Sequence, residues 1–170
     1  LPKVNTNLMY LDENDFTAAV GNLPLVSIDL CILSPEDKIL FVKRNCPPAR
    51  DFYFTPGGRI RKNESKEDAL TRISKDEIGI DLLADYKPTL MGVWDHFYPD
   101  SAFDENVSTH YVNLPHFVRL SEAHMRLLNI EVGAECQHHS YMWLDANEAG
   151  YREDIHSYSK VYAQQIQQFI

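Results

Sequence analysis

Residues 57–80, GGRIRKNESKEDALTRISKDEIGI, carry the clearest local signals in the chain. Ser65 and Asp68 form a variant of the capping box, in which side chains satisfy free backbone amides at the start of a helix. Gly79 supplies the signal that ends a helix. We therefore expect a helix that begins near residue 66 and ends at about Ile78.

The last turn of this helix contains a carboxylate that needs a positive partner. Glu77 lies one turn after Ile73, at the end where the helix dipole already presents negative charge. Lys75 could neutralise Glu77 in an ordinary ion pair. A hard divalent metal ion, bound by carboxylate and carbonyl oxygens, is the functional alternative. The residues alone leave both interpretations open.

The rest of the chain mixes strand and helix signals. We expect strands at 24–33, 38–44, 52–60, 89–98, 110–120 and 140–144, and helices at 12–22 and 157–170. Residues 34–37 read as a hairpin loop, a Pro-Gly-Gly turn divides the segment 52–60, and the polar loop 99–108 is of the kind that closes over ligands. The order lacks a regular strand–helix–strand alternation. It therefore excludes a doubly wound nucleotide-binding fold and indicates an α+β fold, with a mixed sheet flanked by helices.

Length and composition indicate one ordinary globular domain. The chain has 170 residues, of which 44% are hydrophobic and 24% charged. No apolar run approaches the roughly 18 residues that a membrane-spanning helix needs, and the first residues lack a secretory pattern. Cys31, Cys46 and Cys136 are scattered, so we expect reduced thiols rather than a zinc site or a disulfide framework. These features favour a cytoplasmic protein.

The charge distribution favours a small anionic ligand over a nucleic acid. The formal net charge is −9, which would repel DNA or RNA. Residues 43–62 nevertheless contain six basic residues and a single acid, Asp51. A compact basic region in an acidic protein suits a small anion, although a solvated basic hairpin would have the same composition.

The segment 57–80 resembles the Nudix box, G-x5-E-x7-R-E-U-x-E-E-x-G-U, in which U is a bulky aliphatic residue. Six fixed positions match, namely Gly58, Glu64, Arg72, Glu77, Gly79 and Ile80. Three positions depart from the box. Ile73 replaces the Glu after the Arg, Ser74 replaces the aliphatic residue, and Asp76 stands for the first Glu of the pair. Asp76 keeps a carboxylate that could recruit a second metal.

This degenerate box is similar to that of the GDP-mannose mannosyl hydrolases, a Nudix branch that works with one Mg²⁺. The similarity extends to PLVSID (24–29), KR (43–44), FTPGGR (54–59), GVWDHFY (92–98), THYV (109–112) and Q-H-x-x-Y-x-W-L (137–144). The resemblance implies a single Nudix hydrolase domain over residues 1–170. Its implied fold is a mixed β-sheet sandwiched between helices, an α/β/α sandwich that contains the Nudix loop–helix–loop.

The resemblance also implies a reaction and the residues that carry it. Members of this branch hydrolyse GDP-mannose to GDP and mannose by water attack at the anomeric carbon, with inversion. The implied ligands of one Mg²⁺ ion, for which Mn²⁺ can substitute, are the Gly57 carbonyl, the Glu77 carboxylate and the Gln137 amide oxygen. The implied catalytic residues are His138 as general base, Arg44, Arg59 and Arg72 toward the diphosphate, and Asp29, His96 and Tyr111 at the sugar and leaving-group side. The implied nucleotide contacts, across a homodimer interface, are Met9, Tyr10, Asp15 and Lys43.

Two other functions compete with this interpretation. A standard Nudix pyrophosphohydrolase would cleave a nucleoside-diphosphate sugar at phosphorus. Glu64 and Asp76 favour this reaction, whereas Ile73 and the Gln137–His138 pair oppose it. A non-catalytic sensor would bind a nucleotide sugar without needing Glu77, Gln137 and His138 together. Single residues also have structural interpretations, since Arg72 could form only a helix ion pair with Asp76. The choice among GDP-mannose, GDP-glucose and GDP-fucose stays open.

Overall fold

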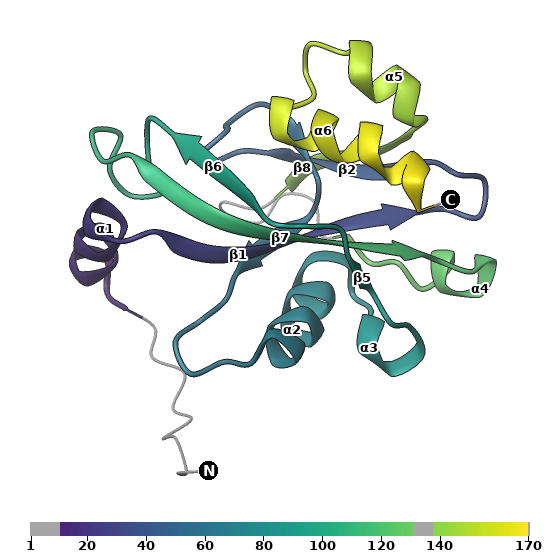
Figure 1. Cartoon of the computed structure of the whole chain (residues 1–170), viewed down its shortest axis with the longest axis horizontal. Coiled ribbons are helices and arrows are strands. Elements are labelled where there is room, and N and C mark those ends of the chain that lie inside the picture. The colour runs from purple at the N-terminus through teal and green to yellow at the C-terminus, as the bar shows by residue number, and fades with distance from the viewer. Residues whose placement is uncertain (1–10, 131–137, 170) are drawn as a thin grey trace.

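Residues 11–130 and 138–169 are described by the structure, a computed structural model shown in Figure 1. The strands are β1 (Leu25–Leu33), β2 (Ile39–Arg44), β3 (Tyr53–Phe54), β4 (Gly57–Arg59), β5 (Thr89–Leu90), β6 (Trp94–Tyr98), β7 (Thr109–Arg119) and β8 (His138–Leu144). The helices are α1 (Glu13–Asn22), α2 (Lys66–Ile78), α3 (Leu82–Asp85), α4 (Glu122–Met125), α5 (Ala146–Tyr151) and α6 (Ser157–Gln165), and α6 continues into a 3₁₀ turn (Ile166–Gln168). None of the helices in these two ranges is long and apolar enough to span a membrane.

The strands form one mixed sheet with β1 at its centre. β1 pairs in parallel with β7 along its whole length, from Leu25 opposite Tyr111 to Leu33 opposite Arg119. It also pairs antiparallel with β2 at one end and with β4 at the other. β3 and β8 pair with β2, and β5 and β6 pair with β7. The expected α+β architecture with a mixed sheet is confirmed.

Strand β1 is buried on both faces because helices cover both sides of the sheet. Its side chains at Ile28, Leu30 and Ile32 pack in one cluster with residues of α2. The alternate side chains, at Cys31 and Leu33, pack in a second cluster with residues of α6. Figure 1 shows α2 and α3 on one face of the sheet and α5 and α6 on the other. Continuous apolar sequence in a strand is typical of such two-sided burial.

Helix α2 has the bounds that its capping signals predict. The Ser65 hydroxyl accepts a hydrogen bond from the Asp68 amide at 3.0 Å and donates one to the Asp68 carboxylate at 2.7 Å. Gly79 adopts the left-handed conformation, with φ of 74°, and its amide bonds to the Lys75 carbonyl. The two loops beside α2 are therefore held in fixed positions relative to the helix.

The predicted strand at 89–98 is interrupted in the structure. β5 and β6 both pair with β7, but they are separated by residues 91–93, of which Met91 donates its amide to the Pro115 carbonyl at 2.9 Å. Proline has no amide to return a bond, so the ladder cannot continue regularly past it. The short helices α3, α4 and α5 were also not expected from the sequence.

One prediction about the cysteines was wrong. Cys46 is disulfide-bonded, and its partner lies outside the described residues, whereas Cys31 is a buried free thiol. Scattered spacing in a sequence does not report which cysteines the fold brings together.

Candidate active site

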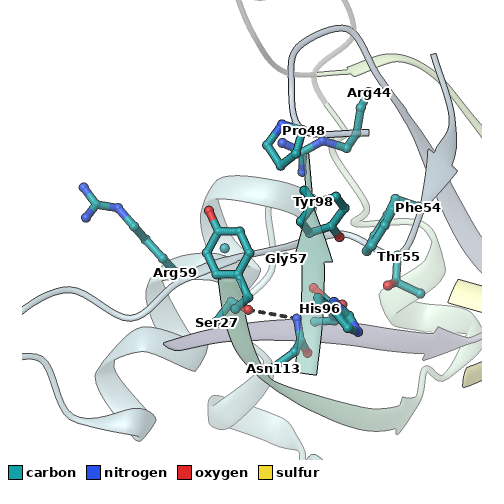
Figure 2. A pocket seen from close by; sticks show the side chains of 13 residues that line it. Ser27, Arg44, Pro48, Phe54, Thr55, Gly57, Arg59, His96, Tyr98 and Asn113 are labelled. Carbon is teal, nitrogen blue, oxygen red and sulfur yellow. Dashed lines mark hydrogen bonds between the residues drawn. The ribbon is translucent and has the colours of Figure 1, made fainter. Parts of the chain in front are cut away.

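A cavity of about 160 Å³ opens where β1, β4, β6 and β7 meet the segment after β2. Figure 2 shows the side chains around it. Its lining residues are Ser27, Asp29, Arg44, Pro48, Phe54, Thr55, Gly57, Gly58, Arg59, His96, Tyr98, Tyr111 and Asn113. The structure thus brings together six residues predicted from the sequence, namely Asp29, Arg44, Gly57, Arg59, His96 and Tyr111.

Asp29 is a buried carboxylate among these lining residues. Its side chain is 5% exposed, and within the described part of the chain its Oδ2 atom has no hydrogen-bond partner. Burial raises the pKa of Asp29 to about 7, although Asn113, Tyr162 and the charge of Arg44 oppose the rise. A buried carboxylate with an unsatisfied oxygen is costly, so it marks a position where a cation or a donor group belongs.

Gly57 lies directly against Asp29 because the two residues are partners in the β1–β4 ladder. A Cβ atom at Gly57 would lie 2.5 Å from Asp29 Oδ1 and 2.5 Å from the Ile28 carbonyl oxygen. Any side chain at this position would therefore push the Asp29 carboxylate away. The glycine is required here by a close approach and not by a turn.

The donors at this corner of the pocket fit one hard divalent cation. Glu77 is half-buried in the last turn of α2, and its charge contributes to the raised pKa of Asp29. The Glu77 carboxylate and the Gly57 carbonyl are oxygen ligands of the kind that Mg²⁺ prefers. Gln137, the third predicted ligand, lies outside the described residues. Among residues 11–130 and 138–169, no group of three or more His, Cys, Asp or Glu side chains forms a metal site.

Arg72 braces the loop before α2. Its Nε and Nη2 atoms donate to the two carboxylate oxygens of Glu64 at 2.6 and 2.8 Å, and Nη2 also donates to the Arg59 carbonyl at 2.9 Å. The Glu64 side chain is only 3% exposed and accepts a further bond from the Arg61 amide at 2.8 Å. Arg72 does not line the cavity. The observed contacts of Arg72 favour a role in holding this loop. They do not favour the predicted role at the diphosphate.

An aromatic cluster forms the rear wall of the cavity. His96 is 2% exposed, its Nε2 lies 2.9 Å from the Tyr162 hydroxyl, and its ring stacks on Tyr158 with centroids 3.9 Å apart. Burial, together with the neighbouring His156, lowers the pKa of His96 to about 4. His96 is therefore a neutral imidazole at neutral pH and is held in one orientation.

The two pocket arginines differ in their surroundings. The Arg44 Nε atom is buried, and within the described part of the chain no hydrogen-bond partner is seen for it. The Arg59 guanidinium lies 4.4 Å from the centre of the Phe16 ring, and Figure 2 shows its side chain extended away from the other labelled residues. Of the two arginines, Arg44 is the one whose charge lowers the pKa of Asp29.

The remaining predicted residues lie away from the cavity or outside the described part of the chain. Lys43 lies near the Tyr53 ring at 5.9 Å, and Asp15 is exposed in the first turn of α1. The backbone of His138 is opposite Arg44 in the β2–β8 ladder, but its side chain is not among those described. Met9 and Tyr10 lie outside the described residues.

Comparison with known proteins identifies the family. The NUDIX domain family matches residues 23–165. The chain belongs to this family. It is 33% identical, over 117 residues, to the low-salt glycan biosynthesis protein Agl8 of Haloferax volcanii, which covers 69% of this chain and 72% of that protein. The chain is thus a Nudix hydrolase, and Nudix hydrolases generally use a divalent metal such as Mg²⁺ or Mn²⁺.

Solved structures agree on the Nudix fold. The MutT protein from Methanosarcina mazei is similar with a TM-score of 0.67 and 14% identity, over 87% of this chain and 96% of that one. The NUDIX domain of Shewanella oneidensis NrtR, in complex with ADP ribose, is similar with a TM-score of 0.65 and 14% identity, over 94% of this chain and 99% of that one. These likenesses show the fold alone.

The departures from the Nudix box have structural explanations. Ile73, at the position of the missing Glu, is 1% exposed and packs beneath Gly58, where a Cβ atom would lie 3.3 Å from its side chain. Ser74 is fully buried and accepts a bond from the Leu82 amide at 3.2 Å, so it caps the backbone of α3. Asp76 is exposed and lies 3.7 Å from Arg72 on the outer side of α2. The missing carboxylate has been replaced by core packing.

Ser27, Tyr98 and Asn113 also line the cavity and were not predicted from the sequence. Each lies two residues along a strand from a predicted site residue, respectively Asp29, His96 and Tyr111. Alternate residues of a strand point to the same face, so this spacing could have identified all three. Asn113 donates to the Ser27 hydroxyl at 2.9 Å, which joins β7 to β1 at the floor of the cavity.

Proposed function

We propose that this Nudix hydrolase is a Mg²⁺-dependent GDP-mannose mannosyl hydrolase, which releases GDP and mannose by water attack at the anomeric carbon. The observation that carries the proposal is Ile73. Its burial beneath Gly58 removes a carboxylate from the centre of the Nudix box, and the space it occupies is apolar core. Chemistry at phosphorus that depends on several metal ions and a glutamate cluster is poorly supported by such a site.

A nucleotide sugar is the substrate class that best suits the available comparisons. The relative Agl8 is named as a glycan biosynthesis protein, and glycan biosynthesis uses activated sugars. The cavity is lined by side chains that can bond to hydroxyl groups, including Ser27, Asn113 and Tyr111. Arg44 adds positive charge at the same cavity, where a diphosphate would need it.

Bound Mg²⁺ would be held by Gly57, Glu77 and Gln137 and would neutralise charge on the diphosphate leaving group. The other tasks fall to side chains of the protein. Arg44 stabilises the charge that develops on the departing GDP. His138 is the proposed base that takes a proton from the attacking water. Asp29, buried beside Gly57, is suited to stabilise positive charge at the anomeric carbon, because the transition state resembles an oxocarbenium ion.

Cleavage at phosphorus is the competing function. It is favoured by the two retained acids Glu64 and Asp76, but their surroundings argue against a role in metal binding. Glu64 is engaged by Arg72, and Asp76 is exposed on the outer side of α2. The homodimer belongs to the same proposal and rests on the resemblance. The single domain over residues 1–170 and the cytoplasmic location are also proposals, and they rest on length and composition.

The first test is the identity of the products. Purified protein is incubated with GDP-mannose and Mg²⁺, and the products are separated by anion-exchange chromatography. We expect GDP and free mannose in equal amounts, and no turnover when the metal is chelated. GMP and mannose 1-phosphate would instead assign the pyrophosphohydrolase activity. GDP-glucose and GDP-fucose, tested in parallel, define the sugar specificity.

A further inference from the structure

Strand β6 lies at an edge of the sheet, and among the described residues β7 is the strand that pairs with it. In an antiparallel pair, every second residue turns its backbone N–H and C=O groups away from the partner strand. Phe97 of β6 is such a residue, because both of its backbone groups bond to a side chain of α6. Unpaired groups at a sheet edge would otherwise face water or another chain.

The side chain that binds these groups is Tyr158, in the first turn of α6. Its hydroxyl accepts a hydrogen bond from the Phe97 amide at 2.8 Å and donates one to the Phe97 carbonyl at 3.1 Å. A single hydroxyl thus makes both bonds that a residue of a neighbouring strand would make. Strand β6 is therefore held between β7 on one side and Tyr158 on the other.

The ring of Tyr158 contacts the residues on either side of Phe97. It stacks on the His96 imidazole, with centroids 3.9 Å apart and an interplanar angle of 1°. It also meets the Tyr98 ring edge to face, with centroids 5.5 Å apart. His96 and Tyr98 both line the cavity, whereas Tyr158 does not. Tyr158 therefore supports two residues of the pocket wall through the strand that carries them.

Tyr158 is itself fixed by the start of α6. Its amide donates to the His156 Nδ1 atom at 3.3 Å. The next residue, Ser159, is fully buried, and its hydroxyl accepts a bond from the Thr55 amide at 3.1 Å. Thr55 directly follows β3 and also lines the cavity. Because the helix is joined to a second segment of the pocket, it gives Tyr158 a rigid support.

We propose that Tyr158 is a positioning residue of the active site, which fastens the edge strand β6 through its hydroxyl and holds the His96 imidazole through its ring. A displacement of about 1 Å in a reacting group can cost on the order of 100-fold in rate, so a support of this kind affects turnover. The effect on turnover rests on the proposed function, whereas the contacts with Phe97 and His96 do not.

Hydrogen exchange tests the contact with β6. Tyr158→Phe keeps the ring and removes the hydroxyl, so the Phe97 amide should exchange with solvent about tenfold faster or more, measured by ¹H–¹⁵N NMR. The Met91 amide, which bonds to the Pro115 carbonyl, is the internal reference and should exchange at the wild-type rate. Equal protection of the Phe97 amide in the variant and the wild type would overturn the proposal. An equal acceleration at Phe97 and Met91 would mean a general loss of stability and would also contradict it.

The kinetic test removes the stacked ring. Tyr158→Leu should lower kcat for GDP-mannose by about tenfold or more while KM changes by less than about twofold, because a misplaced catalytic group acts mainly on the transition state. Tyr151→Leu is the matched control, because Tyr151 lies on α5 and is 89% exposed. It should retain wild-type kcat. Equal kcat for Tyr158→Leu and the wild type would overturn the proposal.

A double-mutant cycle separates positioning from a structural role. If Tyr158 acts through His96, adding Tyr158→Leu to His96→Gln should lower kcat by less than about twofold more. Multiplicative losses in the double variant would show that the ring acts independently of His96 and would contradict the proposal.

The last measurement needs no catalysis and uses the unmodified protein. A proton over the face of an aromatic ring resonates upfield of its usual position, so the His96 ring protons, assigned with His96→Gln, should be shifted upfield in ¹H NMR spectra. Tyr158→Phe should keep this shift. Unshifted His96 protons in the wild type would overturn the proposal even if Tyr158→Leu failed to fold. If the wild type does not hydrolyse GDP-mannose, the proposed function fails, and the shift together with exchange at Phe97 then decides the inference about Tyr158.

Discussion

Three residues of the candidate site are not those expected from core packing alone, namely Asp29, Gly57 and Glu77. Asp29 is buried with an unsatisfied oxygen, Glu77 adds negative charge to the negative end of a helix, and Gly57 leaves just enough room for the Asp29 carboxylate. Each feature is unfavourable for stability when taken alone. A divalent cation bound by the Glu77 carboxylate and the Gly57 carbonyl would compensate the negative charge at this end of the helix.

Glu77→Gln tests this arrangement at the residue scale. A neutral amide is a weaker Mg²⁺ ligand, so the Mg²⁺ concentration for half-maximal activity should rise about tenfold or more and kcat should fall. Asp76→Asn is the matched control, because Asp76 is the neighbouring acid on α2 but points outward. Its Mg²⁺ dependence should stay within twofold of wild type. Equal effects of the two substitutions in a Mg²⁺ titration would mean that Glu77 is not a metal ligand.

Gly57→Ala tests the close approach between β4 and β1. The added methyl group would meet Asp29 Oδ1 and the Ile28 carbonyl, so we expect a loss of about 1–3 kcal/mol in the free energy of unfolding, measured by urea denaturation. Gly150→Ala is the control in α5, where nothing lies within 4 Å of the added atom. It should leave stability unchanged or raise it by up to about 1 kcal/mol. If Gly57→Ala left the free energy of unfolding unchanged, β4 and β1 would separate more easily than the structure implies.

At the scale of elements, local signals were sufficient wherever a few neighbouring residues decide the outcome. Helix α2 was predicted with its cap and its terminating glycine, because Ser65, Asp68 and Gly79 act within a single turn. The hairpin between β1 and β2 was predicted for the same reason. The short helices α3 and α4 have four residues each, too few to produce a periodic pattern.

Long-range pairing accounts for most of what sequence analysis missed. Residues 52–60 read as two strands around a turn, yet β3 pairs with β2 and β4 pairs with β1, so the two strands do not form a hairpin. Arg72 matched a motif position, but only the fold showed that its guanidinium is hydrogen-bonded to the Glu64 carboxylate. Ser27 and Asn113 became site residues because the parallel register of β1 and β7 places them opposite each other.

At the scale of the whole molecule, His96 is buried and His156 is half-buried where the sheet meets α6, and their removal from solvent predicts a pH dependence of stability. Burial lowers the pKa of His156, assisted by the charge of Arg44, and that of His96, in both cases to about 4, compared with about 6.5 in an unfolded chain. The unfolded chain binds more protons between these values. The contribution of the two neutral histidines to the free energy of unfolding is therefore complete above about pH 6.5, and it is lost as the pH falls toward 4.

His156→Asn isolates this contribution. Asparagine keeps an N-cap for α6, which His156 provides by accepting from the Tyr158 amide, but it cannot be protonated. Between pH 7 and 4.5 in metal-free buffer, the wild type should lose on the order of 1 kcal/mol more of its free energy of unfolding than the variant. The comparison is necessary because Asp29, with its raised pKa, has the opposite pH dependence. Parallel curves for the two proteins would show that His156 is not buried in its neutral form.

The central claim, that water attacks carbon and not phosphorus, is tested most directly by isotope labelling. GDP-α-mannose is hydrolysed with Mg²⁺ in ¹⁸O-water, and the isolated GDP is measured by ³¹P NMR, in which ¹⁸O bonded to phosphorus shifts the resonance. Free mannose can exchange its anomeric oxygen with water, so the informative product is GDP. We predict that GDP contains no ¹⁸O and that the first sugar detected by ¹H NMR is β-mannose. Label in a nucleotide phosphate or in mannose 1-phosphate would contradict attack at carbon and assign the pyrophosphohydrolase reaction.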